Sequence, residues 1–267
     1  MNSILSIIVT YNPNLEEFHR NIESIANQSS LCVVVDNNSH NQKDIEKIVE
    51  NTYNSIIIKN LENIGLGKAY NIALNKYLGD YSFFATFDQD SFISEKTLDT
   101  LSQILEKNHI IGVVGPLFSY ECSVVLNTGN LIYKDSIIQS SAVFRSDLYY
   151  KIGGFKEDYF IDSVDFEYCL RIAANNYKVA IFDGIRIQHS LGEQRKKLGI
   201  SYYSHSALRN FYIARNHMKI SKEYYQRFPK FVFKKNIFFL IHFLKLVFLE
   251  QDLKKINSFF KGLKQGL

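Results

Sequence analysis

The first ninety residues alternate between short apolar runs and longer segments in which apolar positions recur every three or four residues. The apolar runs are LSIIVTYN, LCVVVDNNS, SIIIKN and YSFFATFDQD, and each ends in polar or turn-forming residues. Between the first two lies NLEEFHRNIESIANQ, whose apolar residues Leu15, Phe18, Ile22 and Ile25 follow a helical period. Apolar strands that alternate with helices predict a parallel sheet with helices on both faces.

Residues 95–190 follow a less regular pattern. GVVGPLF predicts another strand, and NTGNLIYKDSIIQSSAVFRSDLYYKIGGF predicts a mixture of strands with a short helix. SVDFEYCLRIAANNYKVAIFDGIRIQH predicts a helix followed by a last strand that ends near His189. The charged segment SLGEQRKKLG then predicts a loop.

Polar side chains follow each of the first four predicted strands. They are Thr10, Tyr11, Asp36, Asn37, Asn63, Asp88 and Asp90. Because ligands of open parallel sheets gather at the carboxyl ends of the strands, we expect these side chains to line one binding edge.

Asp88 and Asp90 are separated by a single residue at the end of the fourth strand. Two like charges so close repel each other unless a positive charge lies nearby. A divalent cation is one candidate, because hard cations bind carboxylate oxygens and also neutralise phosphates. An acidic surface turn is the alternative interpretation of this pair.

The composition is that of an ordinary globular protein, with 46% apolar and 22% charged residues among 267. This length suits one large α/β domain with an appendage. The three cysteines match no metal-ligand spacing, and we expect reduced, buried thiols. The N-terminal sequence MNSILSIIVTYNPN lacks the pattern of a signal peptide, which leads us to expect a cytosolic setting.

The net charge of +4 is concentrated near the C-terminus. From residue 222 onward the chain has ten Lys and Arg against three Asp and Glu, interleaved with Phe, Leu and Ile. Lysines interrupt every apolar run there before it reaches the ~20 residues that span a bilayer. This pattern predicts helices at an anionic membrane surface; helices that pack on the rest of the chain or on a second copy in a homodimer are the alternative.

Taken together, TYN at 10–12, DNNS at 36–39, NIG at 63–65 and DQDS at 88–91 resemble a family-2 glycosyltransferase with the GT-A nucleotide-diphosphosugar fold. GGFKEDYFIDSVDFEYCLR, HSLGE and RNFYIARN resemble the rhamnosyltransferase branch of that family. The resemblance covers roughly residues 3–217, with an echo in the terminal FKGLKQGL.

The resemblance implies a binding site for the nucleotide-sugar donor at the carboxyl edge of the predicted sheet. Asp90 would ligate a divalent metal, Mg²⁺ or Mn²⁺, with Asp88 and His189 as further ligands. The nucleotide sugar would be bound by Thr10, Tyr11, Asp36, Asn63, Gly65 and Asp88. From the residues alone, Asn63 and Gly65 are equally explained as a helix cap, and a lone His189 is equally explained as a structural residue.

The resemblance also implies a base that deprotonates the acceptor. Counting back six residues from Arg171 places it at Asp165, with Asp162 as a rival and Glu167 as a second acid. Glu167 would contact the acceptor, and Arg209 and Arg215 would contact the diphosphate or an acceptor phosphate. A solvated helix face is the alternative for these two arginines.

We therefore expect a GT-A catalytic domain, an α/β fold with a mostly parallel sheet flanked by helices, over residues 1–217, and an amphipathic helical tail over 218–267. The expected activity is inverting, metal-dependent transfer of rhamnose from dTDP-rhamnose onto a cell-surface polysaccharide or a lipid-linked saccharide. The expected location is the inner face of the cell membrane, with no nucleic-acid partner.

Three other functions remain open at this point. A hexosyltransferase that uses a UDP-sugar is the nearest. A nucleotidyltransferase would show a Gly-rich basic loop after its first strand, where this chain has the acidic TYNPNLEEF. A non-catalytic membrane scaffold would tolerate loss of the acids.

Overall fold

The computed structural model describes residues 3–119, 128–188, 194–197 and 199–267. The chain divides into two compact units. The first, here called the sheet unit, comprises Met1–Asp158 and Tyr168–His189. The second, the helical unit, comprises Tyr159–Glu167 and Ser190–Leu267.

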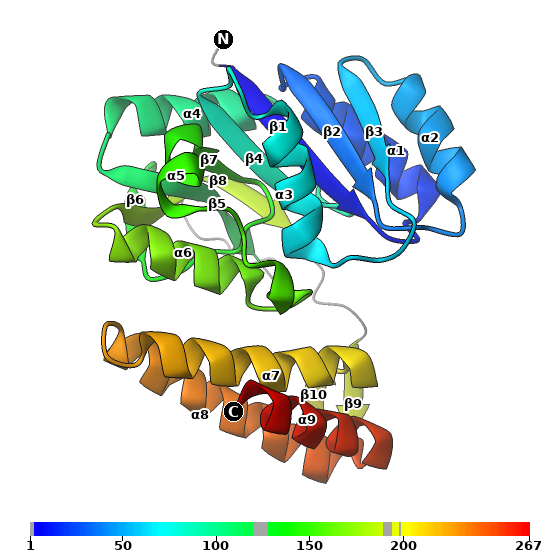
Figure 1. Cartoon of the computed structure of the whole chain (residues 1–267), viewed down its shortest axis with the longest axis vertical. Helices are drawn as coiled ribbons and strands as arrows, with labels where there is room; N and C mark the ends of the chain where they lie inside the picture. The colour runs from blue at the N-terminus through cyan, green and yellow to red at the C-terminus, as the bar shows by residue number, and fades with distance from the viewer. Residues whose placement is uncertain (1–2, 120–127, 189–193, 198) are drawn as a thin grey trace. The chain divides into compact units, whose positions relative to one another are not determined.

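The sheet unit contains one large mixed sheet (Figure 1). Its described strands are β1 (Ile4–Thr10), β2 (Leu31–Asp36), β3 (Ser55–Lys59), β4 (Phe83–Asp88), β5 (Ile111–Ser119), β6 (Leu131–Lys134), β7 (Ala142–Arg145) and β8 (Lys178–Gln188). They lie in the order β3-β2-β1-β4-β7-β5-β8-β6. The first four strands are parallel, and so are β5 and β8, whereas β7 runs antiparallel to β4 and β5. The predicted fold class, a mostly parallel sheet flanked by helices, is confirmed.

The helices of this unit connect the strands as the apolar periodicity predicts. They are α1 (Leu15–Ala26), α2 (Gln42–Glu50), α3 (Leu66–Tyr77), α4 (Thr97–Lys107), α5 (Ser146–Ile152) and α6 (Val164–Ala174), with a short 3₁₀ turn at Glu157–Tyr159. The boundary between the two units falls inside α6, because its first turn belongs to the helical unit.

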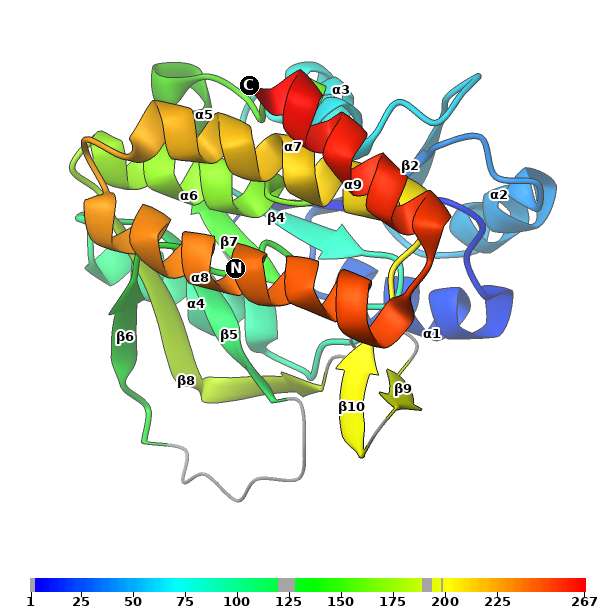
Figure 2. The same cartoon turned by 90° about the horizontal axis from the view of Figure 1, so that it is seen from below.

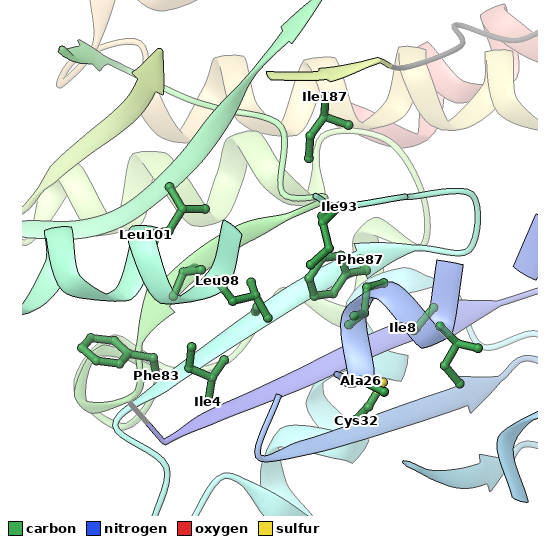
Figure 3. Packing of buried hydrophobic residues seen from close by; sticks show 14 of the residues in the cluster. Ile4, Ile8, Ala26, Cys32, Phe83, Phe87, Ile93, Leu98, Leu101 and Ile187 are labelled. Atoms are coloured by element: carbon green, nitrogen blue, oxygen red, sulfur yellow. The ribbon is translucent and has the colours of Figure 1, made fainter. Parts of the chain in front are cut away.

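The core of the sheet unit forms where α1 and α4 pack on the sheet (Figure 3). Every residue of β1 is buried, which explains its continuous apolar run. Ile8, Phe87 and Leu98 are among the largest members of this core and are at most 1% exposed. Each such side chain contributes about 1.5–3 kcal/mol by burial.

The helical unit consists of a hairpin and three long helices. Its elements are β9 (Gln194–Lys197), β10 (Ile200–Tyr203), α7 (Ala207–Tyr224), α8 (Pro229–Lys245), the π-helical turn η2 (Leu246–Glu250) and α9 (Leu253–Gly266). The prediction of a loop after His189 is wrong for β9, which pairs with β10 in an antiparallel hairpin. The charged sequence of β9, QRKK, shows no apolar alternation, so the usual pattern of a strand is absent there. The predicted domain boundary after residue 217 lies within α7.

The three helices lie side by side around a small aromatic core (Figures 1 and 2). Phe259 of α9 stacks on Phe239 and Phe243 of α8, with ring centroids 5.0 and 5.4 Å away. Two glycines of α9 allow a close approach to α7. A Cβ at Gly262 would overlap the carbonyl oxygen of Phe211, and one at Gly266 would lie 2.5 Å from that of Arg215. The glycines of FKGLKQGL therefore serve helix packing.

Candidate functional site

The carboxyl ends of β1, β2 and β4 meet at one edge of the sheet. Thr10 is paired in register with Asp36 across β1 and β2, and Val9 is paired with Asp88 across β1 and β4. The parallel arrangement therefore brings three of the predicted donor-site residues to adjacent positions, as the strand-end pattern predicts.

Asp36 organises the loop that follows β2. Its carboxylate accepts hydrogen bonds from the hydroxyls of Thr10 and Ser39, at 3.0 and 2.5 Å, and from the Gln42 side chain at 2.6 Å. The backbone N–H of Ser39 donates to Oδ2 of Asp36 at 3.1 Å, the oxygen that also accepts from Gln42. Because Asp36 and Thr10 are fully buried, their geometry here is that of a rigid support for the edge. Their direct contact with a nucleotide stays a prediction.

Tyr11 is tied to the acidic loop after β4 through its backbone. Its N–H donates to Oε1 of Gln89 at 2.8 Å, while Asn21 of α1 donates to the carbonyl oxygen of Gln89 at 3.2 Å. The Tyr11 ring is half exposed. Gln89, the residue between the two aspartates, thus joins the first strand end to the predicted metal site, which sequence analysis did not foresee.

Asp88 and Asp90 differ in their surroundings. Asp88 is partly buried, and its N–H donates to the Ser140 hydroxyl at 3.1 Å, while Asp90 is exposed. The hydroxyls of Ser91 and Ser140 also form a hydrogen bond. Ser140 precedes β7 and is about fifty residues away in the chain, so no local pattern could identify it as a partner of this loop.

The carboxylate oxygens of Asp88 and Asp90 at this edge suit a hard cation that also binds phosphate and water oxygens. Across the described residues, no three His, Cys, Asp or Glu side chains come together as a complete metal cage. The role of Asp88 and Asp90 as metal ligands stays a prediction. His189, the third predicted ligand, lies outside the described residues.

Two buried polar atoms beside β4 have no hydrogen-bond partner among the described residues. They are Oε1 of Gln139 and Oγ of Ser141. Their segment lies against β4, because Thr86 donates to the Gln139 carbonyl oxygen at 2.8 Å and accepts from the Ser141 N–H at 2.7 Å. Unsatisfied polar groups are rare in protein interiors, and a polar ligand at this edge would offer them partners. In the sequence, the polar run QSS inside an apolar stretch is the feature that could have marked this segment as part of a site.

Asn63 and Gly65 form the turn before α3. Oδ1 of Asn63 accepts from the Gly65 N–H at 3.0 Å, and Gly65 has a φ of 83°, which favours glycine. No side chain caps the N-terminus of α3. Asn37 donates to the Gly65 carbonyl oxygen at 3.4 Å, which links the loops after β2 and β3. This supports a structural role for Asn37 and leaves the ligand roles of the other two as predictions.

Asn71 of α3 holds the loop after α5, and sequence analysis missed it. Its side chain pairs with the backbone of Phe155, donating to the carbonyl oxygen at 2.8 Å and accepting from the N–H at 2.9 Å. A Cβ at Gly154 would lie 2.5 Å from Oδ1 of Asn71, so glycine is required there.

The three acids of the DSVDFE segment have separate environments within the helical unit. Arg209 donates to both oxygens of Asp162 at 3.0–3.2 Å. Glu167 is fully buried and accepts from the Tyr224 hydroxyl at 2.9 Å. Asp165 is half-buried in the first turn of α6, where Oδ1 accepts from the Phe166 N–H at 2.8 Å. The assignment of the base to Asp165 stays a prediction.

Charges around this segment are coupled. Burial raises the pKa of Asp162, against the lowering effects of Arg209 and Lys235. Burial lowers the pKa of Lys235 to about 8, although Asp165 and Asp162 both favour its charged form. The Lys235 ammonium lies 3.3 Å from the ring centroid of Phe166. A cation of α8 therefore faces the acids from within the same unit.

The two arginines predicted to bind phosphate both have protein partners. Arg209 is 46% exposed at its side chain and pairs with Asp162. Arg215 is buried, lies 4.6 Å from the ring centroid of Tyr212, and donates to the Asn216 side chain at 3.0 and 3.1 Å. A fully solvated helix face is thus wrong for Arg215. Contact of either arginine with a phosphate stays a prediction.

Sequence comparisons give the same picture. A profile of the family described as glycosyl transferase family 2 matches residues 6–180. The dTDP-rhamnosyl transferase RfbF of Shigella flexneri is 31% identical over 244 residues, which cover 81% of this chain and 79% of that protein. An uncharacterized glycosyltransferase of Methanocaldococcus jannaschii is 25% identical over 244 residues, covering 82% of this chain and 80% of its own length.

Solved structures share the fold. Residues 1–349 of TarS from S. aureus match 98% of this chain and 81% of their own with a TM-score of 0.62 and 16% identity. The mannosyltransferase PcManGT from Pyrobaculum calidifontis, solved with GDP-Man and Mn²⁺, matches 98% of this chain and 74% of its own, with a TM-score of 0.63 and 14% identity. The predicted GT-A architecture is confirmed.

Proposed function

Because the chain belongs to glycosyl transferase family 2, we propose that it transfers rhamnose from dTDP-rhamnose to a saccharide acceptor of a cell-surface polysaccharide, free or lipid-linked. The observation that carries this proposal is the 31% identity to a dTDP-rhamnosyl transferase over four-fifths of the chain. The meeting of Thr10, Asp36 and Asp88 at one sheet edge supports it with a donor-binding geometry.

In this proposal the sheet unit binds the donor. Asp88 and Asp90 hold a divalent cation, Mg²⁺ or Mn²⁺, which would stabilise the negative charge of the departing diphosphate. Asp36 and its hydrogen-bonded neighbours keep the edge of the sheet rigid. Tyr11 has a half-exposed ring that would stack on the nucleobase of the donor.

The helical unit supplies the base. Asp165 accepts the proton of the acceptor hydroxyl as that oxygen attacks the anomeric carbon and the nucleoside diphosphate leaves. A single displacement of this kind inverts the configuration of the sugar. Arg209 and Arg215 lie on α7 of the same unit, and an acceptor phosphate would have to compete with their pairs to Asp162 and Asn216.

A panel of nucleotide sugars tests the proposal. The purified chain is incubated with dTDP-rhamnose, UDP-sugars and GDP-mannose in the presence of Mg²⁺ or Mn²⁺, and release of nucleoside diphosphate is measured. We expect dTDP-rhamnose to give the fastest release. Preference for a UDP-sugar would favour the hexosyltransferase alternative, and release from none of the donors would favour the scaffold.

Asp90→Ala tests the cation site in the same assay. Asp90 is exposed, so its loss leaves the core intact while removing a ligand. We expect turnover to be abolished and the circular dichroism spectrum to be unchanged, and we expect EDTA to reproduce the effect in the wild-type chain. Near wild-type activity after both treatments would contradict the metal assignment.

We also propose that the helical unit associates with the inner face of the cell membrane. Six apolar side chains at helical spacing form one exposed surface, here called the α8 apolar face: Phe233, Ile237, Leu240, Ile241, Leu244 and Phe248, each at least 42% exposed. Lys230 and Lys234 on the same helix are exposed as well. Apolar side chains next to lysines match an anionic lipid surface.

This association would be peripheral. Within the part of the chain that the structure describes, none of the helices combines the length and the apolar composition that crossing a bilayer requires. A second copy of the chain is the other occupant that the α8 apolar face could take.

A further inference from the structure

The loop at 159–163, which leads directly into α6, has an unfavourable backbone conformation. Phe160, Asp162 and Ser163 have φ values of 58°, 62° and 65°, in a region that residues other than glycine seldom adopt. Such conformations persist only where surrounding contacts hold them. The contacts that hold this loop therefore decide where α6, with Asp165 in its first turn, begins.

One face of α7 provides these contacts. Arg209, Tyr212 and Asn216 follow one another at spacings of three and four residues, so they lie on the same side of the helix. Arg209 forms the bidentate pair with Asp162, and the Tyr212 ring stacks on Phe160 with centroids 4.8 Å apart and planes 14° from parallel.

Asn216 makes the most extensive contact of the three. Its Nδ2 donates to the carbonyl oxygens of Tyr159, Ile161 and Asp162 at 2.9, 2.8 and 2.7 Å. Its Oδ1 accepts from Arg215, which fixes the orientation of the amide. The side chain is fully buried, so water cannot replace these bonds.

We propose that Asn216 is a positioning residue for Asp165: its amide holds three carbonyl groups of the 159–163 loop and thereby sets the position from which α6 presents that acid. This inference rests on the proposed function of Asp165 as the base. It assigns to α7 a task beyond phosphate binding, which is to keep a strained loop in its working shape.

Asn216→Asp is the test variant, since the new side chain has the same shape but a carboxylate only accepts hydrogen bonds and so loses all three donations. Asn210→Asp is the matched control. Asn210 is equally buried on the same helix, and its Nδ2 donates to the carbonyl oxygens of His205 and Ser206, away from the loop.

The first readout is steady-state kinetics with the donor that the panel identifies. We expect Asn216→Asp to lower kcat by on the order of 10- to 100-fold, because a displacement of about 1 Å at a reacting group costs this much. KM for the donor should stay near the wild-type value, since the donor site lies in the sheet unit. Equal kcat values for the two variants, or a parallel rise in donor KM, would overturn the proposal.

The second readout needs no activity. Hydrogen exchange at the amides of Ile161 and Glu167, which donate to the loop carbonyl oxygens of Tyr159 and Ser163, should be faster in Asn216→Asp than in the wild-type chain and Asn210→Asp. Unchanged exchange would overturn the proposal. If no donor is turned over, the proposed function fails while exchange still decides whether Asn216 holds the loop. If Asp165→Asn stays active while Asn216→Asp does not, positioning of Asp165 is refuted.

If Asn216→Asp does not fold, two other measurements test the proposal. Asn216→Ser keeps one donor, so its kcat and exchange should lie between those of wild type and the alanine variant Asn216→Ala. Exchange in the wild-type chain is the other measurement: the N–H groups of Ile161 and Glu167, which donate to the carbonyl oxygens of Tyr159 and Ser163, must be protected if the loop is held. Exchange of both at the rate of an unstructured peptide would overturn the proposal directly.

Discussion

Asp165 and Asp162 are close in the chain, but their side chains have different partners. Both oxygens of Asp162 accept from Arg209, while Asp165 accepts from the backbone N–H of its neighbour. Asp165→Asn keeps the size of the side chain and removes the proton acceptor. We expect kcat to fall by roughly 10²–10⁴, the range for loss of a general base, with donor KM retained.

Asp162→Asn is the comparison for this prediction. It weakens the pair with Arg209 but leaves the proposed base in place, so its loss of kcat should be smaller. Loss of transfer in Asp162→Asn together with full activity in Asp165→Asn would show that Asp162 is the base.

At this scale, sequence patterns locate polar residues better than they assign their partners. The strand-end rule brings Thr10, Asp36 and Asp88 together correctly because parallel strands end at one edge. It could not show that Asp36 is saturated by internal hydrogen bonds. Ser140 and Asn216 were missed because their partners are about fifty residues away in the chain, and such contacts leave no local pattern.

At the scale of elements, the packing of α9 on α7 depends on Gly262. A side chain there would overlap the Phe211 backbone, which cannot move away as a flexible side chain could. We expect Gly262→Val to destabilise the helical unit by at least about 1–3 kcal/mol, the usual cost of overpacking. Urea denaturation followed by circular dichroism measures this.

Gln265→Ala is the matched control on α9, because Gln265 is exposed. It should leave the denaturation midpoint near the wild-type value. Equal stability of Gly262→Val and the control would show that α7 and α9 do not pack as closely as described.

Helices and strands were predictable where one face of the element, or the whole element, is buried. The strands β1, β2 and β4 were found from apolar runs because their residues face a core on both sides. The strand β9 was missed because its charged sequence, QRKK, carries no apolar alternation. The tail was correctly expected to be helical, but the packing of its glycines became visible only with α7 as partner.

At the scale of the whole molecule, we expect stability to depend on pH between about 4 and 6.5. Burial, aided by nearby cations, lowers the pKa of His205 to about 4 and that of His242 to about 3. Burial also lowers the pKa of His217 to about 4. The unfolded chain then binds more protons than the folded chain in this window, so stability is lost as the pH falls. Thermal melting at pH 7.5 and 5 measures the loss.

His242→Gln should reduce this pH dependence, because glutamine does not titrate and can still donate to Asn210, which lies 2.7 Å from Nε2 of His242. His40→Gln is the control, since His40 is exposed in the sheet unit. The same pH dependence in all three chains would refute the histidine origin.

Membrane binding is also a property of the whole chain. Removing residues 222–267 is a poor test, because it deletes α9 and the Tyr224 hydroxyl that donates to buried Glu167. Ile237→Glu with Ile241→Glu instead places charges on the α8 apolar face without disturbing buried contacts. We expect the wild-type chain to co-sediment with anionic vesicles at low salt, less at high salt, and the double variant to remain in the supernatant.

Lys261→Glu is the charge control on exposed α9, outside the α8 apolar face. It changes the net charge by two units, as the double variant does, so its binding to the vesicles should weaken by about the contribution of one to two lysines, ~1–2 kcal/mol, without being abolished. Equal vesicle binding by the double variant and the wild-type chain would refute the proposed surface. If light scattering shows that the wild-type chain is a dimer and the double variant is a monomer, a second copy of the chain is the occupant.

The boundary inside α6 has a consequence for recombining relatives of this chain. Tyr159–Glu167 pack with the C-terminal helices, although they are encoded in the middle of the sequence. A chimera joined at a single crossover near residue 190 would combine the 159–167 segment of one parent with the α7 of another. Chimeras of this chain with a relative should therefore fold and function best when residues 159–167 and 190–267 come from the same parent.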